Sequence, residues 1–334
     1  MMTSMGIKNP MNAGMGPILM ASRDPGSANM LVGLHWLLHK SQNGTLREKF
    51  LQILNVDQNA ILRINAWGPA VKVWEHYGWA AHDVGEVETD QDQEFAWACQ
   101  LVAVCAPSVL VTGLDDVDAI RTRALWMAAT QQGVRVVILA DNDTYLLERC
   151  FDLDRRRFEP DIIVVSNERV REGFELENFP MKNVHVLPNL AHERIKADGE
   201  GFNDLRSEWG ATTDQTLVLF VSLVGAEMIE KGRKPPFDET QMLYDLLASL
   251  EKKRLSLPAG PHVSKPFLVV RPHPRENISK FEWMKSAEFT FPVIVSSQGS
   301  PKDAIYSSDW VVGRKSGVVD EAILREAQVY LLAD

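Results

Sequence analysis

The chain has 334 residues, 45% of them hydrophobic and 24% charged, an ordinary composition for a globular protein. This length exceeds that of a usual single domain, so two domains are the default expectation. Asp and Glu total 45 against 35 Lys and Arg, and this net charge of −10 argues against a nucleic-acid-binding protein, whose contact surface is basic.

The cysteines and the first residues indicate a cytoplasmic protein. Cys99, Cys105 and Cys150 have no zinc-type spacing, and the first two lie in apolar surroundings, so we expect buried free thiols. We find no secretory signal, and residues 1–16, rich in Met, Gly and Asn without periodicity, are expected to form a flexible tail. A reducing, cytoplasmic location follows from these expectations.

Residues 95–114 carry no formal charge over a length close to that of a membrane span. Polar residues interrupt the stretch, however, and Ala106-Pro-Ser108 is a turn signal. We therefore expect a buried helix followed by a buried strand, and no transmembrane segment. Peripheral contact with a membrane is left open.

Short apolar runs alternate with helical patterns over the first 190 residues. Runs of Val, Ile and Leu of about four to eight residues are typical of buried parallel strands. Strands are predicted at residues 17–21, 61–65, 109–113, 134–140, 161–166 and 184–188. Helices are predicted at residues 30–40, 70–77, 93–104, 118–131 and 168–175, with a turn-rich loop at 22–29.

The pattern pauses in the polar, Gly-containing residues 191–214 and then restarts. Further strands are predicted at residues 216–223, 267–271, 291–297, 309–312 and 329–332, and helices at 239–252, 304–308 and 318–326. Such alternation means βαβ units and parallel sheets. We therefore predict an α/β fold of two Rossmann-like, doubly wound domains, residues 17–200 and 201–334, that face each other across a cleft. Ligands of such sheets bind outside the carboxyl ends of the strands.

Several common catalytic motifs are absent. No G-x-G-x-x-G follows a predicted strand, and there is no Walker P-loop, H-E-x-x-H, G-x-S-x-G or deaminase zinc signature. A dinucleotide oxidoreductase or a P-loop NTPase is therefore not expected.

Two strand ends in the first half carry acidic residues. In Asp24-Pro-Gly26, Gly26 allows the backbone to approach a ligand and Asp24 can act as a general base on a sugar hydroxyl, although the tripeptide is also a good turn. Asp141-Asn-Asp143 has the spacing of paired carboxylates that hold a divalent metal, a spacing that is also common by chance. At its strand end, Asp141 can also contact an acceptor substrate.

The strand predicted at residues 267–271 ends in Arg271-Pro-His273-Pro274. The two prolines fix the backbone around His273, which lowers the entropic cost of holding its ring in one orientation. Such a histidine can donate to a phosphate oxygen or protonate a leaving group, and Arg271 can supply charge-assisted hydrogen bonds. A stiff strand exit with a surface histidine is the alternative.

Residues 309–326 predict a strand, a small-residue turn and a helix. A helix that begins at such a turn offers free backbone N–H groups and the positive end of its dipole, which suit a phosphate. Lys315 adds charge and Ser316 a hydroxyl beside Gly317. Glu321 falls about one turn into the helix, where it can accept hydrogen bonds from ribose hydroxyls. An ordinary helix start is the alternative.

Together these segments resemble the GT-B superfamily, the two-Rossmann-domain glycosyltransferases and relatives such as nucleotide-sugar 2-epimerases. Residues 271–274 are similar to the "HP" element of bacterial sialyl-, polysialyl- and glycerophosphotransferases. Residues 316–322 resemble the element that holds the donor diphosphate and ribose, and residues 24–29 resemble a first-strand loop of that fold. The resemblance covers most of residues 17–334.

The resemblance implies an acceptor-side domain at residues 17–200 and a nucleotide-sugar domain at residues 201–334. It assigns donor binding to five residues of the second domain, Arg271, Lys315, Ser316, Gly317 and Glu321. It assigns catalysis to Asp24, as the base on the acceptor, and to His273, which stabilises charge on the leaving group. The acceptor side falls to Gly26, Asn29 and Asp141.

The sequence departs from the family pattern in two places. GT-B chains commonly continue past the last strand with a helix, whereas this sequence stops at residues 329–334, and Glu326-Ala-Gln328 replaces the usual G-x-P. These departures keep open a catalytically silent relative that binds a nucleotide-sugar or serves in an assembly.

The predicted function is transfer of a sugar from a UDP-, GDP-, TDP- or CMP-linked donor to a hydroxyl acceptor, as in bacterial-type glycan or polysaccharide synthesis. Fixed positive groups can stabilise the departing diphosphate, so no obligate metal or other cofactor is expected. A nucleotide-sugar epimerase or a glycerophosphotransferase of the same fold is the first alternative. A metal-dependent single-domain transferase, based on Asp141-Asn-Asp143, is a further one.

Overall fold

A computed structural model of the chain describes residues 16–79, 81–83, 85, 90–141, 146–198, 201–230, 232, 238–252 and 265–332. The chain divides after Arg194 into two compact units, here called unit 1 and unit 2. Each unit contains a parallel β-sheet with a hydrophobic core on both faces, as the alternation of strands and helices predicted. The predicted flexible tail lies outside the described residues, apart from Gly16.

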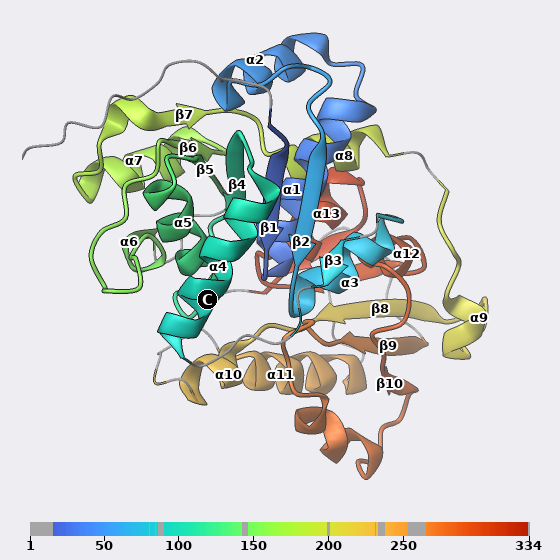
Figure 1. Ribbon diagram of the computed structural model, residues 1–334. Helices are drawn as coiled ribbons and strands as arrows, with labels where there is room; N and C mark the ends of the chain where they lie inside the picture. Colours follow the sequence, from blue (N-terminus) through green and yellow to red (C-terminus); the bar gives the residue numbers. More distant parts are fainter. Residues whose placement is uncertain are drawn as a thin grey trace, which may run out of the picture. The chain divides into compact units, whose positions relative to one another are not determined.

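The sheet of unit 1 has seven parallel strands in the order β3-β2-β1-β4-β5-β6-β7 (Figure 1). They are β1 (Ile18–Ser22), β2 (Leu62–Ala66), β3 (His82–Asp83), β4 (Val109–Gly113), β5 (Arg135–Ala140), β6 (Ile162–Val165) and β7 (Val184–Val186). All but β3 match predicted strands closely. Strand β3 was missed because two polar residues at a sheet edge leave no apolar run in the sequence.

Helices cover both faces of this sheet because successive strand side chains point to opposite sides. Ile18 and Met20 of β1 pack against α1, α2 and α3, whereas Leu19 and Ala21 belong to the core that contains residues of α4, α5 and α7. The helices are α1 (Pro25–His39), α2 (Gly44–Leu54), α3 (Pro69–His76), α4 (Gln91–Cys105), α5 (Ile120–Gln131), α6 (Leu146–Arg149), α7 (Glu168–Leu176), the 3-10 helix η1 (Met181–Asn183) and α8 (Leu190–Ala197), which ends in unit 2.

Unit 2 repeats the same plan with five parallel strands in the order β10-β9-β8-β11-β12. The strands are β8 (Thr216–Val221), β9 (Pro266–Arg271), β10 (Val293–Val295), β11 (Trp310–Gly313) and β12 (Val329–Leu331), each close to a predicted strand. One face packs against α11 (Glu239–Glu251) and the 3-10 helix η2 (Ile278–Lys285), and the other against α9 (Arg206–Trp209), α12 (Pro301–Tyr306) and α13 (Gly317–Leu324). A short helix, α10 (Gly225–Glu230), follows β8.

Two helices of unit 1 differ from the predictions. Helix α1 begins at Pro25 rather than at residue 30, so the predicted loop at 22–29 is wrong in its second half. Proline suits the first helical position because its φ is already helical and it has no N–H to satisfy. Helix α2 was not predicted, although Leu46, Phe50 and Leu54 are buried at a spacing of four and the Asn43 side chain caps the helix by accepting from Leu46 N at 3.1 Å.

A buried ion pair joins α4 to α5. Arg121 donates from Nε and Nη2 to the two carboxylate oxygens of Glu94, each at 2.7 Å, and these side chains are 4% and 1% exposed. The guanidinium also lies 4.5 Å from the ring centre of Trp97 and 5.7 Å from that of Trp67. Bidentate geometry and aromatic contact compensate the cost of removing both charges from water.

The uncharged stretch at residues 95–114 forms most of α4 followed by the buried strand β4, so the predicted order of helix and strand is confirmed. The helix itself is buried on one side only, and Val104 is 72% exposed. Within the described part of the chain, no helix combines the length and the apolar character needed to cross a bilayer. All three cysteines are free thiols. Cys105 and Cys150 are buried, whereas Cys99, also expected to be buried, is half-buried.

The start of α8 packs directly on α1. A Cβ placed on Gly33, in the middle of α1, would overlap the backbone carbonyl of Leu190. Glycine at this position therefore allows the segment after β7 to lie against α1. The two nearest atoms belong to the backbone and the third is the Leu190 Cβ, so no flexible side-chain end can move aside.

We predict that Gly33→Ala destabilises unit 1 by about 1–3 kcal/mol, the usual cost of overpacking, despite the higher helix propensity of alanine. Gly44→Ala is the matched control, because a Cβ at Gly44 would meet no described atom within 4 Å. It should change the free energy of unfolding by less than about 1 kcal/mol. Urea unfolding followed by circular dichroism measures both. Equal stabilities of the two variants would show that α8 does not press on Gly33.

Candidate functional site

Both sheets share the strand order at which ligands of doubly wound folds bind. The first strand of each unit, β1 or β8, lies between the second and the fourth strand of that unit. The connections that leave two such neighbouring strands run in opposite directions, so a gap opens at their carboxyl ends, where ligands of this fold class bind. Asp24 and Gly26 follow β1, His273 follows β9, and Ser316 and Gly317 follow β11. Most predicted site residues therefore lie at these two sheet edges.

In unit 1, Asp24 ties the loop after β1 to the loop after β4. Its Oδ2 accepts a hydrogen bond from Asp116 N at 2.7 Å, and its backbone N donates to Asp115 Oδ1 at 3.1 Å. Both contacts depend on the parallel pairing of β1 with β4. Asp24 is half-buried as a residue, although its carboxylate Oδ1 is buried, whereas Asp115 is almost fully buried.

Asp115 is the residue of this edge that the sequence analysis missed. Its side chain is 1% exposed and accepts from Thr122 Oγ1 at 2.6 Å and from Arg23 N at 3.3 Å. Burial, together with the nearby charge of Asp24, raises the pKa of Asp115 to about 6. The sequence alone does not single out Asp115, since its contacts with Asp24 and Thr122 arise only in the folded chain.

The acceptor-side residues Gly26 and Asp141 are brought together. A Cβ on Gly26 would overlap the carboxylate of Asp141, so the first turn of α1 lies against that side chain. Arg149 Nη2 donates to Asp141 Oδ1 at 2.9 Å, and Arg149 Nε donates to Asp115 O at 3.2 Å. Asn29 is half-buried one turn further along α1 and makes no side-chain hydrogen bond with the described residues.

The metal hypothesis for Asp141-Asn-Asp143 depends in part on residues 142–145, which lie outside the described part of the chain. Among the described residues, no group of three or more His, Cys, Asp or Glu side chains is arranged to hold a metal ion.

In unit 2, His273 is held in a closed turn. Its backbone N donates to Glu276 Oε2, its carbonyl accepts from Glu276 N at 2.9 Å, and its ring Nδ1 accepts from Arg275 N at 3.1 Å. The proton of the neutral ring is therefore on Nε2. Burial, with smaller effects of Arg275 and Lys280, lowers the pKa of His273 to about 3. The ring thus offers a neutral hydrogen-bond donor near pH 7, not the proton or positive charge that the sequence analysis also considered.

The start of α13 is open. Ser316 is the N-cap, and its Oγ accepts from Val319 N at 3.4 Å. The backbone N–H groups of Gly317 and Val318 have no acceptor among the described residues, as is usual in a first helical turn. Gly317 and the neighbouring Lys315 are exposed, and a Cβ on Gly317 would meet no described atom within 4 Å. This combination suits an anionic group.

Glu321 and Arg271 lie behind this helix start and already have partners. Arg325 donates to Glu321 Oε1 from Nε at 2.9 Å and from Nη2 at 2.8 Å, and it also bonds Asp198. Arg271 donates to the carbonyls of residues 298 and 299, each at 2.8 Å. Burial lowers the pKa of Arg271, and the charges of Glu321 and Asp303 oppose that change. Glu321 is thus a positioned carboxylate with acceptor capacity on its second oxygen.

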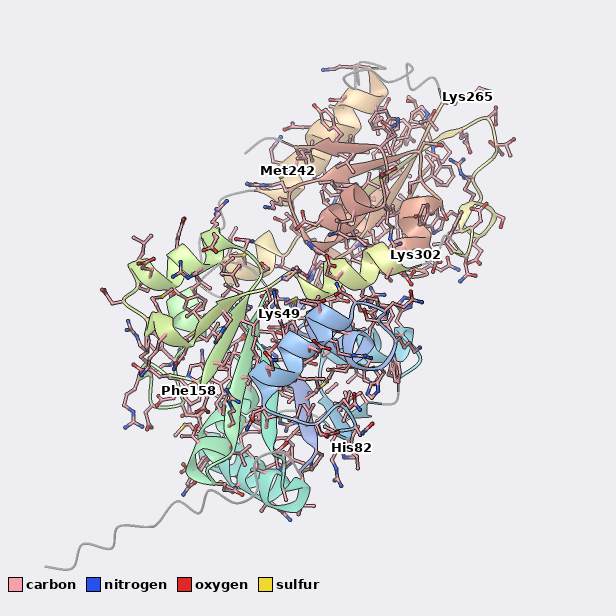
Figure 2. The ribbon with its side chains drawn as sticks, turned by 90° about the horizontal axis from the view of Figure 1, so that it is seen from above. Lys49, His82, Phe158, Met242, Lys265 and Lys302 are labelled. Atoms are coloured by element: carbon pink, nitrogen blue, oxygen red, sulfur yellow. The ribbon has the colours of Figure 1, made fainter. Side chains whose placement is uncertain are left out.

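Asp198 also pairs with Lys302, at 3.6 Å between Nζ and Oδ2; Figure 2 labels Lys302 among the side chains of unit 2. The ion pairs of Asp198 with Lys302 and Arg325 hold the beginning of unit 2 against α12 and α13.

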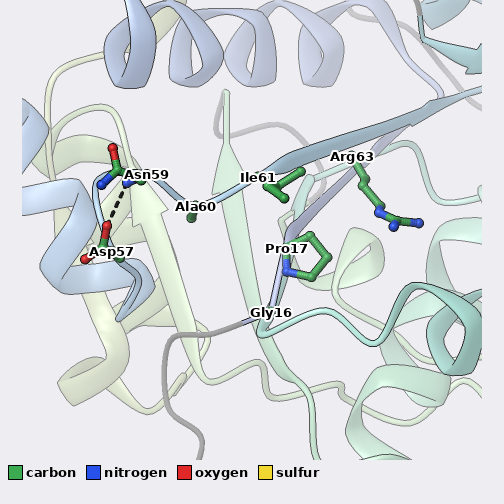
Figure 3. Close-up of a pocket in the computed structure, with 7 residues that line it drawn as sticks. All are labelled: Gly16, Pro17, Asp57, Asn59, Ala60, Ile61 and Arg63. Atoms are coloured by element: carbon green, nitrogen blue, oxygen red, sulfur yellow. Dashed lines mark hydrogen bonds between the residues drawn. The ribbon is translucent and has the colours of Figure 1, made fainter.

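A cavity in unit 1 lies elsewhere. It measures about 240 Å³ and is lined by Gly16, Pro17, Asp57, Asn59, Ala60, Ile61 and Arg63 (Figure 3). Pro17 and Ile61 precede β1 and β2, so this cavity lies at the amino ends of the strands, at the edge opposite Asp24. It contains none of the predicted site residues.

No protein-family model matches the sequence, and no curated protein matches it. Solved structures are similar at the level of the fold. The UDP-GlcNAc 2-epimerase of Neisseria meningitidis bound to UDP-GlcNAc has a TM-score of 0.62 at 13% identity, with 95% of this chain and 83% of that chain covered. The UDP-GlcNAc 2-epimerase of Methanocaldococcus jannaschii with UDP-GlcNAc and UDP has a TM-score of 0.61 at 11% identity, with 94% and 83% covered. The S. aureus MnaA–UDP structure has a TM-score of 0.59 at 12% identity, with 96% and 80% covered.

These likenesses show the fold. The chain has two Rossmann-like domains of the GT-B type, and the fold implied by the family resemblance is confirmed. The assignment of residues 271–274 to an "HP" element stays a prediction, as do the roles of the individual site residues.

We predict that Asp24→Asn lowers the pKa of Asp115 by about one unit, because it removes a like charge beside a buried carboxyl. The value should stay above 3.8, the ordinary pKa of an aspartate, since Asp115 remains buried. Carboxyl ¹³C NMR titration measures it. Asp118→Asn is the control, because the Asp118 carboxylate is partly exposed and pairs with Arg23 at 2.6 Å. An unchanged Asp115 titration in Asp24→Asn would rule out the coupling.

Proposed function

We propose that the chain binds a uridine-diphosphate sugar and epimerises that sugar. Unit 2 has the features that suit the nucleotide, and unit 1 has those that suit acid–base chemistry. Two of the similar structures are of UDP-GlcNAc 2-epimerases with UDP-GlcNAc, and the third contains UDP. They support the epimerase alternative better than glycosyl transfer, which the sequence analysis placed first.

The open start of α13 at the crevice edge of unit 2 is the observation that carries this proposal. The N–H groups of Gly317 and Val318 and the exposed Lys315 provide two neutral donors and one charge for a diphosphate. Glu321, one turn further, has an oxygen available for ribose hydroxyls. The neutral Nε2–H of His273 is a further donor at the same sheet edge, because β9 and β11 flank β8 and lie on the order of 10 Å apart.

The acidic residues of unit 1 support the acid–base part of the proposed epimerisation. Inversion at a sugar carbon requires a proton to leave one face and return to the other, so a group that titrates near neutral pH is needed. Asp24 and Asp115 form a carboxylate pair in which the pKa of Asp115 is about 6. Asp24 is the half-buried member of the pair and the proposed base on the ligand, and Asp115 is the buried member.

Glycosyl transfer is the second candidate. The first turn of α1 places Gly26 against Asp141 and next to Asp24, and a base in that position suits an acceptor hydroxyl equally well. Backbone donors and Lys315 can stabilise a departing diphosphate in either reaction.

The deciding experiment is incubation with UDP-GlcNAc in D₂O without an acceptor, followed by NMR of the sugar. The expected result is a second epimer with deuterium at the inverted carbon, formed at least about 100-fold more slowly by Asp24→Asn, the usual loss when an acid–base group is removed. Asp118→Asn should react like the wild type. A product that forms only with an added hydroxyl acceptor would establish transfer instead. Binding of UDP without turnover would identify a silent relative, and absence of UDP binding in calorimetry would disprove the proposal.

A second prediction concerns the ribose. Glu321→Gln should weaken UDP binding by about fivefold, because a neutral amide oxygen replaces the charged acceptor of the ribose hydroxyls, and a hydrogen bond to a charged group is worth about 1 kcal/mol more than a neutral one. Binding of inorganic pyrophosphate, which has no ribose, should change less than twofold and is the control. Isothermal calorimetry measures both ligands. Equal losses for UDP and pyrophosphate would mean that Glu321 acts on the phosphate seat or on the fold.

A further inference from the structure

In the turn after β9, every polar atom of His273 except ring Nε2 has a partner among the residues that the structure describes. The backbone N and O both bond Glu276, and Nδ1 accepts from Arg275 N. Pro272 and Pro274 restrict the backbone on either side. The ring is thus fixed in one tautomer and one orientation, with a single N–H that remains available.

Glu276 makes the contacts that hold this turn. Its side chain is 0% exposed, and while Oε2 accepts from His273 N, Oε1 accepts from Ser222 Oγ at 2.8 Å and from Lys280 Nζ. Ser222 directly follows β8, so one carboxylate joins the exits of two neighbouring strands at the carboxyl edge of the sheet.

Lys280 extends this network. Besides Glu276, its ammonium donates to Leu223 O at 3.2 Å and to Glu239 Oε1 at 3.1 Å. Leu223 lies in the loop after β8, and Glu239 opens α11. A fully buried carboxylate is costly unless it is paired and hydrogen-bonded, and Lys280 is the charge that compensates Glu276. A buried, paired charge has few alternative positions, so it fixes geometry more strictly than a neutral turn residue would.

We propose that Glu276 is a positioning residue for His273: it fixes the ring so that Nε2–H alone points out from the turn, and through Ser222 and Lys280 it holds the loop after β8 in register with that donor. The group that Nε2 would meet is an anionic phosphoryl oxygen. Only this last part rests on the proposed function, since the fixation of the ring depends on unit 2 alone.

The test uses the full-length protein with ¹⁵N-labelled histidine and reads the ring ¹⁵N shifts of His273 against pH. The wild type should show the Nε2–H tautomer throughout and no titration between pH 5 and 8, because the pKa is about 3. Glu276→Gln should give a mixture of tautomers and raise the ring pKa by at least one unit, since the loosened turn admits water. Glu282→Gln, which removes an exposed carboxylate that pairs with Lys285 on the same 3-10 helix, should match the wild type.

A folded Glu276→Gln protein with wild-type ring shifts and titration would overturn the proposal. If that variant does not fold, Glu276→Asp decides, because it keeps the charge for Lys280 but shortens the reach to His273 N. Tautomer mixing in this variant supports the positioning role, and a wild-type ring overturns it.

The phosphoryl part is tested separately by UDP affinity. Glu276→Gln should bind UDP at least fivefold more weakly, and Glu282→Gln within twofold of the wild type. A disordered ring with unchanged UDP affinity would overturn the contact between Nε2 and phosphate. A wild type that binds no UDP would disprove the proposed function, while the ring data would still decide the role of Glu276.

Discussion

The constraint on which the structure depends is that central parallel strands are covered on both faces. Every residue of β1 and of β4 is buried, so their side chains fill the two cores and none remains for a ligand. Polar chemistry is therefore confined to the residues that follow the strands, and the strand order gathers those residues at one edge of each sheet. Asp24, His273 and Ser316 occupy such positions for this reason, not because of any local motif.

The buried carboxylates of this structure have two kinds of hydrogen-bond partner. Glu94 and Glu276 are each paired with a cation, Arg121 or Lys280, and both pairs join separate elements. Asp115 is different, because its hydrogen bonds come from the Thr122 hydroxyl and from backbone amides, which are neutral donors. In the first arrangement a cation opposes the effect of burial, although burial still raises the pKa of Glu276. The second leaves burial uncompensated, so the pKa of Asp115 rises into the range where a carboxyl can exchange protons.

The sequence predicted the fold well because buried parallel strands correspond to short apolar runs of residues, such as those of β4 and β5. The sequence predicted less well the elements whose apolar residues are few or are spread along the chain. Strand β3 has two polar residues, and α2 has a clear spacing of Leu46, Phe50 and Leu54 that was overlooked. The turn-forming sequence before α1 hid a proline-initiated helix.

The sequence predicted where the candidate site residues lie better than it predicted their chemical properties. Strand ends and a small-residue helix start identify Asp24, His273 and Ser316. The partners that set their properties are distant in sequence: Asp24 N meets Asp115 across 91 positions, and Ser222 meets Glu276 across 54. The low pKa of His273 depends on burial, which spacing does not reveal. The pair of Glu321 with Arg325, in contrast, has helical i,i+4 spacing and was readable in the sequence.

The carboxylate pair after β1 and β4 has a thermodynamic consequence. A group that is partly protonated at about pH 6 gains or loses hydrogen ions whenever a neighbouring charge arrives or leaves. Occupancy of that edge by any charged molecule is then linked to uptake or release of protons. The heat of association would consequently include the ionisation enthalpy of the buffer, and its dependence on buffer would count the protons exchanged.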